Sequence, residues 1–183
     1  MSEAKDRIGA PAKAGDREAG DRDGGDIDFT IIELLFFAYR DFTSDPDQIL
    51  GTYGFGRAHH RVVHFVNRRP GLTVAELLDV LQITKQSLAR VLKQLIDTGH
   101  IVQVQGPRDR RQRELHPTPK GRALALALAA PQSRRISKAL AEAAPGDRAT
   151  VERFLMGMVN PELRAQIRDA GTAARDDRGL KED

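Results

Sequence analysis

The side chains with the clearest chemical potential lie on one short segment, residues 84–96. Gln86, Arg90 and Lys93 are spaced so that they share one face of a helix at about 100° per residue. The opposite face carries an apolar stripe at helical spacing, formed by Leu88, Val91, Leu92, Leu95 and Ile96. Amide and guanidinium groups pair bidentately with adenine and guanine edges, and lysines such as Lys85 suit phosphates. The pattern predicts a helix that reads a DNA major groove.

A second group of cations follows around residues 106–113. From Thr84 to Arg122, nine cations face three acids, a net charge of +6, whereas the whole chain carries only +3. Four of these cations surround one turn: Arg108, Arg110, Arg111 and Arg113. Positive charge concentrated in this way is typical of a phosphate-binding surface. The alternative is a solvated face without a partner.

Local signals predict the elements that would position these groups. Thr73-Val-Ala-Glu76 matches a capping box, which predicts a helix start there, and Thr84 is an expected N-cap for the next helix. Gly99 is expected to end that second helix, and short strands are expected at 101–105 and 113–116. Two short helices followed by a hairpin predict a winged helix-turn-helix. With a helix expected at 56–67, the predicted DNA-binding part is about 56–117.

The sequence also predicts helices in the segments on either side of the DNA-binding part. Residues 27–42 predict a helix that is apolar on nearly every side, with Phe29, Phe36, Phe37 and Tyr39 among its side chains. Such a helix needs cover on several sides, so a dimer interface is expected. Residues 43–51 are expected to form a loop because they contain Asp45-Pro46 and Gly51. Helices over 118–160, kinked or interrupted at Pro131, are expected to complete the dimerisation part.

The ends and the composition set further limits. Residues 1–26 and 169–183 hold few large apolar side chains, so two disordered tails are expected around a domain spanning 27–168. The chain has no cysteine, which excludes disulfides and thiolate metal sites. Residues 1–26 lack the apolar segment of a signal peptide, and the longest apolar run is too short to span a bilayer. We therefore expect a soluble cytoplasmic protein without a membrane partner.

Several motifs together resemble the MarR family of winged-helix transcriptional regulators. They are Pro70-Gly-Leu-Thr-Val-Ala-Glu-Leu77, Ile83-Thr-Lys-Gln-Ser87, Leu95-Ile-Asp-Thr-Gly-His-Ile101, Asp109-Arg-Arg and Thr118-Pro-Lys-Gly121. The resemblance implies a mainly helical winged fold with a small β-hairpin and flanking dimerisation helices. It also implies a homodimer on palindromic promoter DNA. His116-Pro117 departs from the apolar residue usual in the family, and we expect it to shorten the second wing strand.

The same resemblance assigns roles to individual residues. In the helix at 84–96, it implies that Gln86, Ser87, Arg90 and Lys93 contact DNA. In the wing, it implies that Arg111 enters the minor groove, where inserted arginines meet focused negative potential. Asp109 would orient Arg111, and Arg110 would contact phosphate. An effector pocket near Tyr39, His60, Arg61 or His64 is implied as well.

The histidines are the remaining candidates for chemistry. His60 and His64 are four residues apart on a predicted helix, a spacing that can hold a metal ion, but no acidic or thiol ligand lies nearby in the sequence. Polar roles at a surface or in a pocket are commoner for such histidines. No nucleophile and base are arranged as in a hydrolase, so an enzyme is not expected, and no cofactor is implied.

These observations favour one function over two alternatives. The leading hypothesis is a homodimeric transcriptional repressor that binds palindromic DNA and is released by a small molecule. One alternative is a winged-helix protein-interaction module that never reads DNA, but such a module has no need for the arginines around residues 108–113. The other is a metal-responsive regulator that uses His60 and His64.

Overall fold

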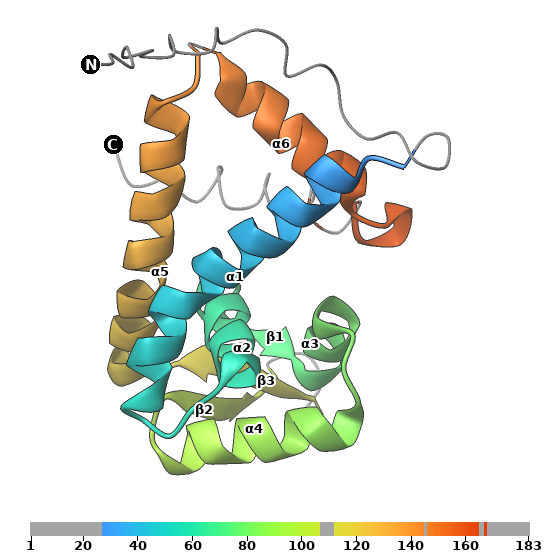
Figure 1. Ribbon diagram of the computed structural model, residues 1–183. Helices are drawn as coiled ribbons and strands as arrows, with labels where there is room; N and C mark the ends of the chain where they lie inside the picture. Colours follow the sequence, from blue (N-terminus) through green and yellow to red (C-terminus); the bar gives the residue numbers. More distant parts are fainter. Residues whose placement is uncertain (1–26, 107–111, 145, 165–166, 168–183) are drawn as a thin grey trace, which may run out of the picture. The chain divides into compact units, whose positions relative to one another are not determined.

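The computed structural model describes residues 27–106, 112–144, 146–164 and 167 (Figure 1). Both predicted tails and residues 107–111 of the predicted wing tip lie outside these described residues. The helices are α1 (Phe29–Gly51), α2 (Arg57–Arg68), α3 (Val74–Leu81), α4 (Lys85–Asp97), α5 (Pro119–Ala141) and α6 (Asp147–Met158). The strands are β1 (Leu72–Thr73), β2 (Ile101–Gln105) and β3 (Arg113–Pro117). This arrangement confirms the predicted fold class, a mainly helical winged helix-turn-helix.

Helix α1 is longer than the sequence predicts, and the expected loop at 43–51 is wrong. The helix runs on through Pro46 to Gly51, with Thr43, Pro46 and Leu50 buried. A proline inside a helix removes the N–H that would bond to the carbonyl four residues earlier. Here that carbonyl belongs to Phe42, and the side-chain amide of Gln132 in α5 donates to it at 3.3 Å. The helix therefore continues because α5 supplies the missing donor.

The chain divides within α1 into two units, one ending at Phe37 and the other beginning at Ala38. The second unit contains the core. Its fully buried large side chains come from α1, α2, α3, α4, β3 and α5, and they include Leu50, Val62, Val66, Leu77, Leu81, Leu88, Leu95, Leu115 and Leu128. One apolar cluster thus holds both helices of the helix-turn-helix against the sheet and against α2.

The predicted caps start α3 and α4. The Thr73 hydroxyl oxygen accepts from the Glu76 backbone N–H at 3.3 Å, and a Glu76 carboxylate oxygen accepts from the Thr73 N–H at 2.8 Å, so the capping box is confirmed. At α4, the Thr84 hydroxyl oxygen accepts from the Ser87 N–H at 3.2 Å. Between the two helices, Gln82 adopts a left-handed conformation with φ 50°, which reverses the chain.

The sheet has a strand that the sequence reading missed. Its order is β1-β3-β2, and the two-residue β1 pairs antiparallel with β3. The expected shortening at His116-Pro117 is wrong, because β3 pairs with β2 along its whole length, from Gln105↔Arg113 to Ile101↔Pro117. Pro117 is tolerated because it is the last residue of β3 and lies beyond the positions that β1 pairs.

Helix α5 also continues through a proline, so the expected kink or interruption at Pro131 does not end it. Its start is tightly joined to the sheet. Thr118 caps α5 by accepting from the Gly121 N–H at 3.0 Å, and its hydroxyl donates to the Gly99 carbonyl at 2.7 Å. A Cβ on Gly121 would lie only 2.0 Å from the His100 carbonyl oxygen. The Thr-x-x-Gly motif therefore allows the backbone of α5 to meet the residue just before β2.

Candidate nucleic-acid interface

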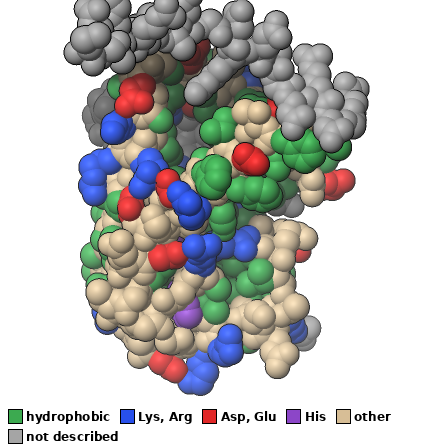
Figure 2. Space-filling view, in the orientation of Figure 1, with side chains coloured by type: hydrophobic (Ala, Val, Ile, Leu, Met, Phe, Trp, Pro, Cys, Tyr) green, Lys and Arg blue, Asp and Glu red, His purple; other side chains and the backbone are tan. Residues whose placement is uncertain are grey.

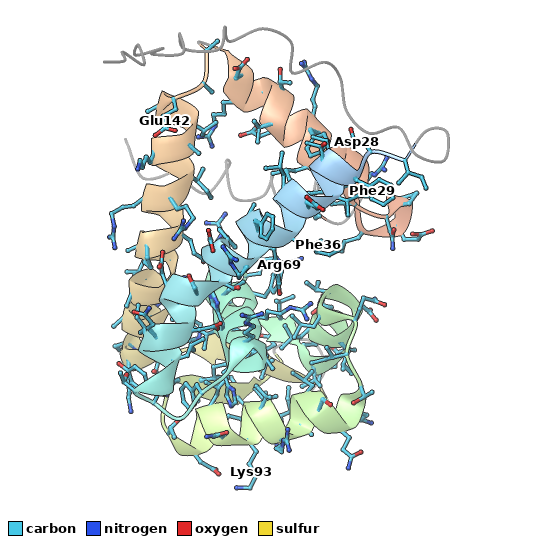
Figure 3. All side chains as sticks on the ribbon, viewed as in Figure 1. Asp28, Phe29, Phe36, Arg69, Lys93 and Glu142 are labelled. Atoms are coloured by element: carbon cyan, nitrogen blue, oxygen red, sulfur yellow. The ribbon has the colours of Figure 1, made fainter. Side chains whose placement is uncertain are left out.

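Helix α4 is buried on one side and exposed on the other, as predicted. Leu88, Val91, Leu92 and Leu95 are buried. The opposite face is exposed and carries Lys85, Gln86, Ser87, Arg90 and Lys93, which we call the recognition face. Figure 1 shows α4 at the edge of the second unit, and Figure 2 shows Lys and Arg side chains at that edge. The labelled Lys93 points away from the helix (Figure 3). The structure thus brings the predicted α4 residues together on one accessible face.

Only some of the polar side chains on the recognition face form contacts within the protein. Lys93 pairs with Asp97 one turn along α4, and both side chains are more than half exposed. The Thr84 hydroxyl donates to the Ser87 hydroxyl oxygen at 2.9 Å. Among the described residues, no ion pair is formed by Lys85 or Arg90. These two cations are therefore available to a polyanion without breaking an internal pair.

The end of α4 is built as a Schellman motif. Gly99 has φ +72°, its N–H donates to the Ile96 carbonyl at 2.9 Å, and the His100 N–H donates to the Leu95 carbonyl at 2.8 Å. The predicted glycine cap is confirmed. The Lys120 ammonium adds a bond at 2.9 Å to the Thr98 carbonyl, which suits the negative end of the helix dipole.

The described part of the wing consists of strands β2 and β3 and the residues next to them. Strands β2 and β3 leave the helix-turn-helix as a hairpin, and the Gly106 N–H donates to the Gln112 carbonyl at 3.0 Å where the strands part. Arg108, Asp109, Arg110 and Arg111 lie outside the described residues. The hairpin formed by β2 and β3 was predicted by the sequence.

The four residues predicted near an effector pocket do not all face one another. Burial lowers the pKa of His60, the neighbouring His64 lowers it further, and Asp47 acts in the opposite direction. Burial also lowers the pKa of His64. Arg61 instead donates to the Leu81 carbonyl at 2.7 Å, so it caps the end of α3.

Tyr39 lies on α1, and the guanidinium of Arg57 is 5.8 Å from its ring centroid. Arg57 in turn pairs with Asp47 at 2.8 Å. Among the described residues, no group of three or more His, Asp or Glu side chains is placed to hold a metal ion. No helix in the described part of the chain has the length and apolar character needed to cross a bilayer.

Comparison with known proteins places this geometry in a family. A sequence profile described as MarR family matches residues 53–112, which run from the loop before α2 to the start of β3. The HTH-type transcriptional regulator PetP of Rhodobacter capsulatus is 50% identical over 133 residues, or 73% of this chain and 80% of PetP. The chain belongs to the MarR family. Its members found in these comparisons are transcriptional regulators and not enzymes.

Solved structures agree with the winged-helix fold of this MarR-family chain. A crystal structure titled MarR matches with a TM-score of 0.58 at 21% identity, covering 82% of this chain and 98% of MarR. A mutant of MepR from S. aureus bound to an oligodeoxyribonucleotide matches with a TM-score of 0.50 at 17% identity, covering 72% of this chain and 96% of MepR. At these identities the likeness concerns the fold alone.

Some structural features of the interface were not found from the sequence. Gln94 of α4 accepts a hydrogen bond from His59 of α2, and Arg61 of α2 caps α3. Sequence reasoning placed Arg61 near a pocket and did not single out His59 as a functional residue. Neither link has a local signal, because each depends on how α2 crosses the helix-turn-helix.

Proposed function

We propose that this MarR-family regulator is a homodimeric repressor that binds palindromic promoter DNA and is released by a small molecule. The observation that carries the proposal is the recognition face of α4, which is exposed while the other side of the helix is fixed in the core. A rigid helix with accessible amide and guanidinium groups is what direct readout of base edges requires. In the solved MepR complex, a protein of the same fold is bound to an oligodeoxyribonucleotide.

We assign two different roles to the residues of the recognition face. Gln86 and Arg90 carry the groups that recognise adenine and guanine, so they read sequence. Lys85 and Lys93 neutralise phosphates and set the register of the helix on the duplex, and Ser87 supports them at the helix start. Lys93 must exchange its bond to Asp97 for a phosphate.

The wing supplies the second contact. We assign Arg111 to the minor groove, Asp109 to orienting it, and Arg108 and Arg110 to the flanking phosphates. The support is that these residues lie in the sequence between β2 and β3, two paired strands that follow α4 directly. The DNA-binding part is then about 56–117.

Exposed apolar side chains on α1 and α6 support the homodimer. Phe36 of α1 is 69% exposed and Leu34 is 56% exposed (Figure 3 labels Phe36). On α6, the exposed apolar side chains are Val151, Phe154, Leu155 and Met158. Apolar surface of this extent marks an interaction site rather than an ordinary surface. Pairing through these helices would present two recognition faces to successive major grooves, roughly 34–36 Å apart.

We assign the release step to the surroundings of Tyr39, His60 and His64. His60 and His64 are on the same helix as the two residues that contact α3 and α4, so a molecule bound there would act on the helix-turn-helix through α2. Aromatic and imidazole groups beside a cation suit an aromatic or acidic effector.

Selection of bound sequences from random double-stranded DNA tests the proposal directly. We expect enrichment of a palindrome whose half-sites are about 10 base pairs apart, centre to centre. Enrichment without symmetry would reject the dimeric mode, and no enrichment at any salt concentration would reject sequence-specific DNA binding. Arg90→Ala should lose the preference at one position of each half-site.

A second experiment tests the dimer by itself. Phe36→Asp places a charge in the exposed apolar surface of α1 and should give a monomer in light scattering. Val102→Asp places the same charge on an exposed apolar residue of β2, outside the predicted dimerisation helices, and serves as the matched control. A dimeric Phe36→Asp protein would show that α1 is not the interface.

A further inference from the structure

The last turn of α4 rests on a small cluster of rings, which we call the histidine–aromatic cluster. It consists of Tyr53, Phe55, His59 and His100. The His59 ring stacks on Phe55 with centroids 4.7 Å apart and an angle of 5°, and the Tyr53 ring stacks on Phe55 at 5.7 Å. His100 meets Phe55 edge-on at 5.3 Å. Phe55 is buried, so His59 is held on a fixed surface.

Hydrogen bonds determine which nitrogen of His59 carries the proton. The Gly56 backbone N–H, at the start of α2, donates to His59 Nδ1 at 3.1 Å. Nδ1 must therefore be the unprotonated nitrogen, and Nε2 carries the hydrogen. Nε2 is 2.9 Å from the side-chain oxygen of Gln94, so it donates to α4. His59 is a neutral imidazole with both nitrogens engaged.

His100 is neutral by a similar argument. The Thr98 hydroxyl donates to the Gln94 carbonyl at 2.7 Å, which leaves its oxygen to accept from His100 Nδ1 at 2.9 Å. His100 is 1% exposed, and its Nε2 has no partner among the described residues. A lone pair there can remain in apolar surroundings, whereas a second N–H would need an acceptor. Gln94 is thus joined to one imidazole through its side chain and to the other through Thr98.

The hydrogen bonds of His59 connect α2 to the C-terminal turn of α4. The core fixes the buried stripe of α4, but only the bond from His59 joins an α2 side chain to the polar side of this turn among the described residues. Lys93, which we assign to phosphate, directly precedes Gln94. A loose last turn would let the end of the recognition face shift.

We propose that His59 is a positioning residue for DNA binding, which holds the last turn of α4 through its hydrogen bond to Gln94. The inference rests on the proposed function, because the recognition face matters only if α4 contacts DNA. It concerns neither the effector site nor the residues that touch DNA.

Two substitutions at position 59 separate positioning from packing. In His59→Gln, the amide can accept from the Gly56 N–H, as glutamine does at this capping position, and can donate to Gln94. His59→Phe keeps a flat ring on Phe55 but removes both hydrogen bonds. At pH 7.5 and fixed salt, His59→Phe should bind DNA about threefold to tenfold more weakly, the worth of a hydrogen bond. His59→Gln should bind within about twofold of the native chain, because it keeps both bonds.

Rescue by glutamine, together with a double variant, provides the readout that a merely structural residue would not change. Gln94→Ala should remove most of the effect of His59→Phe when the two are combined, because the two residues act through one bond. An equal loss of DNA affinity in His59→Gln and His59→Phe, or additive losses in the double variant, would overturn the inference.

Measurements without DNA keep this inference separate from the proposed function. Nitrogen NMR shifts of His59 should show the hydrogen on Nε2 at pH 7.5, and a hydrogen on Nδ1 would overturn the inference. Amide exchange of residues 94–99 should be faster in His59→Phe and unchanged in His59→Gln. If these results are obtained but no DNA is bound, the connection to α4 stands and the proposed function fails.

Discussion

At the recognition face, Arg90 and Lys93 are one turn apart but are not equivalent. Arg90 forms no ion pair among the described residues, whereas Lys93 is bonded to Asp97. A guanidinium that is already free reads a base without first breaking a contact. Arg90 is therefore the α4 cation best suited to sequence readout.

Arg90→Ala should weaken binding to the selected operator by about 1–3 kcal/mol and relax the preference at one base of each half-site. Arg90→Lys is the matched control, because it keeps the charge and loses the bidentate geometry. Competition binding with single-base operator variants measures both effects. A loss that is uniform across all DNA sequences would show that Arg90 contacts only phosphate.

Gly121 lies where the start of α5 meets the segment that follows α4. Gly121→Ala should lower the free energy of unfolding by at least about 1–3 kcal/mol, because the new methyl group would overlap the His100 carbonyl oxygen and that backbone must move. Urea unfolding followed by circular dichroism measures the change. Gly51→Ala is the control, since nothing lies within 4 Å of a Cβ built there. Equal stability of both variants would contradict this close approach.

Among the elements, those of the helix-turn-helix could be predicted because their signals are local. Thr73, Glu76 and Thr84 each act within three residues of their own position. The apolar stripe of α4 likewise needs only its own periodicity. The recognition face could therefore be located from the sequence, including which side of the helix is exposed.

The elements that were misread depend on distant partners. Helix α1 passes through Pro46 because Gln132, 90 residues from Phe42, supplies a donor to the Phe42 carbonyl. Strand β1 has two residues and exists only through pairing with β3. The residues near positions 46 and 72 contain no sequence signal for these distant partners. Local rules therefore predicted a loop at 43–51 and no strand before the helix expected to start at Thr73.

The explanation of α1 makes a prediction at the element scale. Gln132→Ala should cost about 0.5–1.5 kcal/mol of stability, the net worth of one hydrogen bond. In a Pro46→Ala background the cost should be smaller, because the new backbone N–H at position 46 can bond to the Phe42 carbonyl itself. A double-mutant cycle in urea measures this coupling. Additive effects would mean that the Gln132 amide does not replace the donor missing at Pro46.

Across the whole molecule, three histidines are affected by burial in the same direction. Burial is the leading cause that lowers the pKa of His60, His64 and His100, and Lys120 lowers that of His100 further. When a histidine has a lower pKa in the folded chain, the unfolded chain binds more protons at mildly acidic pH. Linkage then requires the free energy of unfolding to rise with pH in that window.

We therefore expect stability to fall as the pH decreases from about 7.5 through the ordinary histidine pKa of 6.5 toward 5.5. Each histidine can contribute at most about 1.4 kcal/mol per pH unit. The hydrogen bonds from Thr73 lower the pKa of Glu76, so its own contribution is lost only below the ordinary value of 4.5 and does not enter this window. Urea unfolding at fixed protein concentration, repeated at each pH, measures the slope. His100→Phe should flatten the slope even where its stability is lower at every pH. A stability that is constant or rises on acidification would contradict the neutral, buried state of these histidines.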